Sequence, residues 1–264
     1  MTTTQINLLA TALLATQAVI LFGLAHHNQS KRHLQAFLIF WSGVCLTTFF
    51  YYLLAHFSLS ISKTWVGLTL DTANNFMLAF CAYALFRGDA FNWSDKFIKI
   101  GWGLFLAEIV ATITVGVIVP TEDPIWKMFN ISPNTLMAAI SLLAVGIGLF
   151  REPTAHAVRW AALILFGLYA FLQFPGYYFR FVGMTPEAEE SNKIISMFLA
   201  AGKFSVFIMF IAIPLSITKE NEATKFVRSM QILTSLLVVG FTLFVLFFRV
   251  FQSVELVTKP LVSG

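Results

Sequence analysis

The chain has 264 residues, of which 58% are hydrophobic and only 11% are charged, and its mean hydropathy is +0.79. A water-soluble domain needs more charge than this to cover its surface, so the composition indicates an integral membrane protein. The net charge of +4 is small and lies in the polar connections. It fits contact with an anionic lipid bilayer and gives no indication of nucleic-acid binding.

Eight apolar stretches are long enough to cross a bilayer as helices, since a span needs about twenty mostly apolar residues. In chain order they cover residues 6–25, 35–57, 64–86, 97–119, 133–150, 157–179, 194–217 and 229–250. No Lys or Arg precedes the first stretch, which favours a retained span over a cleaved signal peptide. We expect an all-α polytopic bundle of about eight transmembrane helices, forming a single domain over residues 1–264. The count falls to seven if the last stretch does not cross.

The distribution of Lys and Arg predicts the orientation, because cytoplasmic loops of membrane proteins are enriched in these residues. With the N-terminus outside, ten of them lie in inside connections and four in outside ones. The inside set is Lys31, Arg32, Arg87, Lys96, Lys99, Arg151, Arg159, Lys219, Lys225 and Arg228, and the outside set is Lys63, Lys127, Arg180 and Lys193. We therefore expect a multi-pass protein of a bacterial inner or plasma membrane with its N-terminus outside.

Three charged residues lie well inside the apolar stretches, namely Asp71, Glu108 and Lys203. Each costs about 3 kcal/mol or more in hydrocarbon unless it is paired, hydrated or neutralised. At 1.5 Å per residue, Asp71 and Lys203 lie about 10 Å and about 14 Å below the outer ends of their helices. An Asp71–Lys203 ion pair would make both charges tolerable. Glu108 is expected nearer the midplane, as a protonated carboxyl with a local hydrogen bond.

Asn74 and Asn75 follow Asp71 at the third and fourth positions, so the three side chains share one helical face. That face must point into the bundle, because amides that face lipid have no hydrogen-bond partner. Together with Glu108 and Lys203, these residues are candidates for binding an ion, a proton or a polar ligand group. The alternative interpretation is an internal salt bridge that only fixes the register of the helices. Both interpretations stay open.

Catalytic and metal-binding motifs are not recognised: the sequence has no Ser-His-Asp set, phosphate-binding loop, HExxH or CxxC pattern. This disfavours an enzyme with a recognisable active site. His26, His27 and His33 cluster in the first inside connection, but their spacing matches none of the usual metal sites. We expect them to belong to a solvated basic loop. No metal site is predicted, and the sequence names no cofactor.

One resemblance is carried by residues 74–91, NNFMLAFCAYALFRGDAF, which end in a short apolar-Arg-Gly turn. With residues 157–178 and 198–213, this segment resembles the multi-helix membrane modules that precede output domains in bacterial sensor kinases and nucleotide cyclases. The resemblance implies a sensor or signal-transduction module, acting with a membrane protein partner or as a homo-oligomer. The main alternative is a transporter or channel for an ion or small solute that uses Asp71, Glu108 and Lys203.

A second resemblance is to microbial rhodopsins, which carry a retinal Schiff-base lysine in the seventh helix, where Lys203 lies, and an acidic counterion in the third, where Asp71 lies. The chain departs from that family, because Leu68 stands where an Arg is usual and Leu199 where an Asp is usual.

The aromatic sixth-helix segment around a proline is similar to the rhodopsin retinal box and implies cavity-lining roles for Phe171, Phe174, Pro175 and Tyr178. A retinal-binding protein with Lys203 as the Schiff-base lysine is thus a further alternative.

Overall fold

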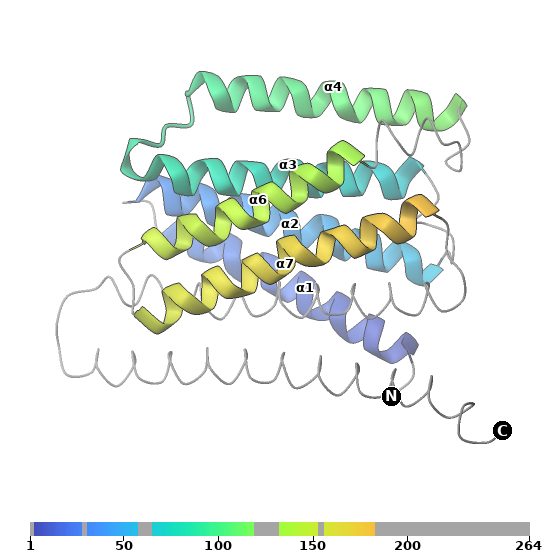
Figure 1. The fold of residues 1–264 in the computed structure, drawn as a ribbon, viewed down its shortest axis with the longest axis horizontal. Coiled ribbons are helices and arrows are strands. Elements are labelled where there is room, and N and C mark those ends of the chain that lie inside the picture. Colours follow the sequence, from blue (N-terminus) through green and yellow to red (C-terminus); the bar gives the residue numbers. More distant parts are fainter. Residues whose placement is uncertain (1–2, 28–30, 58–64, 119–131, 153–155, 183–264) are drawn as a thin grey trace.

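A computed structural model describes residues 3–27, 31–57, 65–118, 132–152 and 156–182 (Figure 1). These ranges contain six α-helices, one 3₁₀ turn and no strand. The elements are α1 (Thr3–His27), α2 (Arg32–Phe57), α3 (Trp65–Arg87), η2 (Gly88–Ala90), α4 (Lys96–Ile118), α6 (Ser132–Arg151) and α7 (His156–Val182). The expected all-α fold is confirmed for the described part of the chain.

Three of these helices are long and apolar enough to cross a membrane. The qualifying segments are Arg32–Leu54 of α2, Lys96–Val115 of α4 and Ser132–Arg151 of α6. Helix α3 has the length, but its polar residues Asp71, Asn74 and Asn75 lower its hydropathy. These helices indicate a helical membrane protein. The apolar stretches 194–217 and 229–250 lie outside the described residues.

Helix α3 is central, because it packs against α2, α4 and α6, while α1 packs on α2 and α7 on α6 (Figure 1). It runs antiparallel to α2, as the contact of Gly43 with Met77 and the Cys81–Phe37 hydrogen bond show. It runs parallel to α6: Asn75 meets Asn134 near one end and Leu85 meets Gly148 near the other. The residues of α3 are thus shared among three neighbours.

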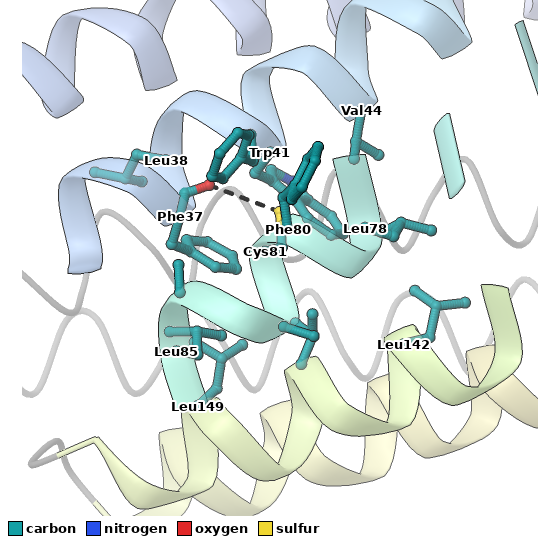
Figure 2. Close-up of a cluster of buried hydrophobic side chains, with 14 of the residues drawn as sticks. Phe37, Leu38, Trp41, Val44, Leu78, Phe80, Cys81, Leu85, Leu142 and Leu149 are labelled. Atoms are coloured by element: carbon teal, nitrogen blue, oxygen red, sulfur yellow. Dashed lines mark hydrogen bonds between the residues drawn. The ribbon is translucent and has the colours of Figure 1, made fainter. Parts of the chain in front are cut away.

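The core lies between α1, α2, α3, α6 and α7 and consists of apolar side chains. Trp41 of α2 is fully buried and meets the ring of Phe166 from α7 at 5.6 Å between centroids. Figure 2 shows the α2–α3 part of this core, where the thiol of Cys81 donates to the carbonyl of Phe37 at 3.8 Å. Below it, Leu85 and Leu149 lie in the same cluster. Both cysteines, Cys45 and Cys81, are free thiols buried in this core.

Helix α4 lies along one edge of the bundle (Figure 1). Only 17% of its apolar span is buried, against 39% for α2 and 44% for α6. Aromatic contacts hold it on α3, with ring centroids of Phe76 and Phe105 5.3 Å apart and those of Phe80 and Trp102 5.1 Å apart. Its other faces are apolar and exposed, as in a helix that is solvated by hydrocarbon.

Candidate functional site

The amide of Asn74 connects α3 to α2. Its Nδ2 lies 3.2 Å from the carbonyl oxygen of Val44, 3.0 Å from Thr47 Oγ1 and 2.9 Å from Thr48 Oγ1. Both threonine hydroxyls donate to carbonyls of their own helix, so they can only accept from the amide. Three acceptors around one nitrogen fix which end of the amide faces α2.

The amide of Asn75 connects α3 to α6. Its Nδ2 donates to the carbonyl oxygen of Asn134 at 3.1 Å and lies 3.4 Å from Asn134 Oδ1. The Nδ2 of Asn134 in turn donates to Thr72 Oγ1 at 3.4 Å, so the two helices exchange side-chain hydrogen bonds. Consecutive residues of α3 therefore hold two different neighbouring helices.

Asp71 lies one turn before these amides, on the part of α3 that faces the interior between α2 and α6. It is half-buried and close enough to Tyr52 of α2 for the two groups to interact electrostatically. Tyr52 also interacts with Tyr169, which is fully buried on α7. A carboxyl group and two tyrosines thus lie in the same part of the interior as the two asparagines.

The polar face of α3 offers more acceptors than donors. Each amide is bound through its nitrogen. Within the described part of the chain, the amide oxygens of Asn74 and Asn75 accept no hydrogen bond. Both residues are half-buried, as is the carboxyl of Asp71. Oxygen atoms of this kind suit a small cation or a ligand that donates hydrogen bonds, such as an ammonium group. The described residues contain no group of three His, Cys, Asp or Glu side chains that could hold a metal ion.

Glu108 lies on the other side of α3. It follows Phe105 by three residues, and the antiparallel register of the aromatic contacts puts it level with Ala73, about 3 Å deeper than Asp71 at 1.5 Å per residue. Helix α4 covers the α3 face that carries Phe80, and Phe80 lies about 180° from Asp71 around the helix at about 100° per residue. The two carboxyls thus have similar depth but lie on opposite sides of α3. Glu108 is half-buried and makes no hydrogen bond or ion pair with another described residue.

The remaining predicted site residues divide into three groups. Lys203 lies outside the described residues, so its pairing with Asp71 stays a prediction. Helix α7 continues through Pro175 and Tyr178 to Val182. Phe171 and Phe174 of α7 are 68% and 52% exposed, and their cavity-lining role stays a prediction. Among the α7 side chains whose burial is described, the aromatic residues Phe166 and Tyr169 are buried.

A second polar group, at the end of the bundle where α2 begins and α6 ends, was not recognised in the sequence. His33, expected in a solvated loop, is 4% exposed, and this expectation was wrong for that residue. Its Nε2 lies 3.2 Å from Oε1 of the buried Glu152, and its Nδ1 lies 3.4 Å from Oδ1 of the exposed Asp89. The burial results from the end of α6 and the η2 turn, which lie far from His33 in the sequence. No local spacing could have indicated it.

Asp95 forms a neighbouring polar group at the start of α4. The Tyr83 hydroxyl donates to its Oδ2, the backbone N–H of Phe97 donates to its Oδ1, and Arg87 lies 3.3 Å from Oδ2. These interactions, the Tyr83 hydrogen bond foremost, hold the pKa of Asp95 below its ordinary value of 3.8. The bond to Phe97 is an N-cap of α4. This group ties the end of α3 to the beginning of α4.

Comparison of the chain with protein-family models, with curated proteins and with solved structures found no significant match.

Proposed function

We propose that this chain is a multi-pass membrane sensor or interaction module whose responsive element is the polar face of α3. The observation that carries the proposal is the division of roles between two consecutive amides. Asn74 binds α2 and Asn75 binds α6. A ligand that rotates either amide, or that binds the carboxyl group of Asp71, changes the contacts of α3 with its neighbouring helices. Such a site couples binding to helix packing, which is what a sensor requires.

The chemical class of the ligand follows from the oxygen atoms of the cluster. Asp71 supplies a carboxyl group, and each amide keeps an oxygen without a donor from the described residues. We infer a small cation or an amine as the signal. In the full topology that we propose, eight spans cross a bacterial inner or plasma membrane with the N-terminus outside. A membrane protein partner or a second copy would receive the signal.

The test measures helix packing in the purified protein. Nitroxide labels at Leu46→Cys on α2 and Leu143→Cys on α6, both exposed positions, report the distance between these helices. Sodium, potassium, ammonium and methylammonium chloride are compared at constant ionic strength with a bulky cation as the reference. We expect at least one small cation to shift the distance, and Asp71→Asn to abolish the shift. Glu108→Gln is the matched control, because α3 lies between this carboxyl and the cluster, and it should retain the response.

The same cations distinguish sensing from transport in a liposome flux assay. Acceptor oxygens inside the bundle also favour a transporter or channel, although Asp71 and Glu108 lie on opposite sides of α3 and so do not form one continuous path. Cation flux that Asp71→Asn abolishes would establish transport and defeat the sensor proposal. If none of these cations causes either flux or a distance change, both assignments are defeated. For the retinal alternative, protein expressed with all-trans retinal should absorb visible light only if Lys203 forms a Schiff base.

A further inference from the structure

The inner polar group stands apart from the responsive element proposed above but involves the same three segments of the chain. His33 lies in the first turn of α2, Asp89 lies in η2 directly after α3, and Glu152 directly follows α6. The outer polar layer joins α2, α3 and α6 through Asn74 and Asn75. The same helices are thus connected by polar side chains at two levels of the bundle.

His33 has different relations to its two carboxylates. Glu152 is buried, and because a carboxylate can only accept, the His33 Nε2 must carry the hydrogen that points to it. Asp89 is 95% exposed at its side chain, and its Oδ1 lies within ion-pair distance of His33 Nδ1 without hydrogen-bond geometry. The Glu152 contact therefore forms in both charge states of the ring, whereas the Asp89 contact depends on the charge of the ring.

We infer that His33 is a proton-controlled latch that holds the η2 turn against α2 when the ring is charged and releases it when the ring is neutral. In the charged ring both nitrogens carry hydrogen, so it binds Glu152 and Asp89 together. In the neutral ring with hydrogen on Nε2, a lone pair on Nδ1 faces the Asp89 carboxylate and repels it. Histidine is the side chain that exchanges a proton between about pH 5 and 8.

The neighbouring charges leave Asp89 as the movable partner. Arg87 lies within ion-pair distance of Asp95, Arg151 lies over the ring of Phe86, and His26 at this end of α1 is exposed. The η2 turn itself begins at Gly88 with a φ of 53°, a conformation in which glycine is favoured. A change at Asp89 therefore moves a turn that connects α3 to α4.

The experiment follows the η2 turn with a nitroxide at Ala90→Cys, an exposed position, while the native Cys45 and Cys81 are buried and unreactive. We expect an immobilised spectrum at pH 5 and a larger mobile fraction at pH 8. His33→Gln and Asp89→Asn should each remove this difference. Because Asp89 is exposed, its substitution tests the latch even if the His33 variant fails to fold. His156→Gln removes an exposed histidine of α7 and should leave the difference intact.

The latch is overturned if the spectrum does not change between the two pH values, if Asp89→Asn keeps the full change, or if His156→Gln abolishes it. None of these outcomes depends on cation binding by Asp71. Failure of the latch and failure of the proposed sensor function are therefore observed separately.

Discussion

Asn74 is the residue whose bonding pattern is most sensitive to the chemistry of its side chain. Its nitrogen faces three acceptors, and the two threonines among them already donate their hydrogens to α2 carbonyls. Removing the donor leaves those acceptors less well satisfied, which costs little. Replacing the donor by a further acceptor sets like dipoles or charges against one another. The two substitutions therefore separate a lost hydrogen bond from an introduced repulsion.

We predict that Asn74→Ala lowers the stability of the protein in detergent by about 1 kcal/mol, the usual contribution of a side-chain hydrogen bond between membrane helices. Asn74→Asp at pH 8 should cost roughly 1–3 kcal/mol more, because an ionised carboxylate would face three acceptors. Thermal unfolding measures both. Asn92→Asp is the matched control, since Asn92 is exposed and uses its oxygen as an acceptor for Ser94. Equal losses for the two Asn74 variants would contradict an amide whose nitrogen points toward α2.

Asp95 makes a prediction about acid stability. Its pKa in the folded protein is lowered from 3.8, chiefly by the Tyr83 hydrogen bond. A lowered carboxyl pKa contributes stability that is present above the unfolded value and is lost as the pH falls through the folded value. Between pH 5 and more acidic conditions, the wild type should therefore lose more thermal stability than Asp95→Asn. Tyr83→Phe should reduce this acid sensitivity in part. Identical pH profiles for all three proteins would refute the assignment.

Helix α6 depends on close approach at two glycines. A Cβ at Gly148 would lie 2.7 Å from Leu85 Cβ of α3, and one at Gly146 would lie 2.8 Å from Phe166 Cβ of α7. The backbone fixes the position of a Cβ atom, so a new rotamer cannot relieve either clash. The helices would have to separate. Small residues at such contacts let membrane helices pack backbone to backbone.

Gly146→Ala and Gly148→Ala should each destabilise the protein by about 1–3 kcal/mol, the typical cost of overpacking. Gly103 on the exposed side of α4 offers the comparison, because nothing lies within 4 Å of its added Cβ. Gly103→Ala should be neutral or stabilise by up to about 1 kcal/mol, since alanine favours helix. Unfolding in detergent followed by circular dichroism compares the three. A Gly148→Ala variant as stable as Gly103→Ala would show that α3 and α6 do not meet closely.

The helices themselves were predictable, because an apolar stretch of sufficient length indicates a spanning helix. The predicted ranges 64–86 and 133–150 correspond to α3 (Trp65–Arg87) and α6 (Ser132–Arg151). It was harder to predict which helices lie side by side and which of their residues meet. The spacing of Asn74 and Asn75 indicates a shared face, but which neighbour each amide binds depends on how α2 and α6 are arranged around α3. For the same reason the sequence could name Asp71 and Glu108 as candidates for one site but could not show that they lie on opposite sides of α3.

For the whole molecule, the alternation of helix directions gives a prediction about sidedness. Antiparallel pairing of α2 with α3, and of α3 with α4, puts the beginning of α2 and the η2 turn at the same end, as the His33–Asp89 contact requires. Lys31 and Trp93 should therefore be on one side of the membrane. The Lys and Arg bias predicts that this side is the cytoplasm. Positions 61, 127 and 188, which lie outside the described residues, are predicted on the opposite side.

Single cysteines at these five positions, introduced into a variant lacking Cys45 and Cys81, can be labelled in intact cells with a membrane-impermeant maleimide. We expect labelling at 61, 127 and 188 without lysis, and at 31 and 93 only after the membrane is permeabilised. Labelling at 31 and 93 together in intact cells would invert the orientation while preserving the fold. Labelling at only one of these two would contradict the fold itself, because the contact between His33 and Asp89 requires both positions to lie on the same side of the membrane. That outcome would exclude the latch as well as the topology.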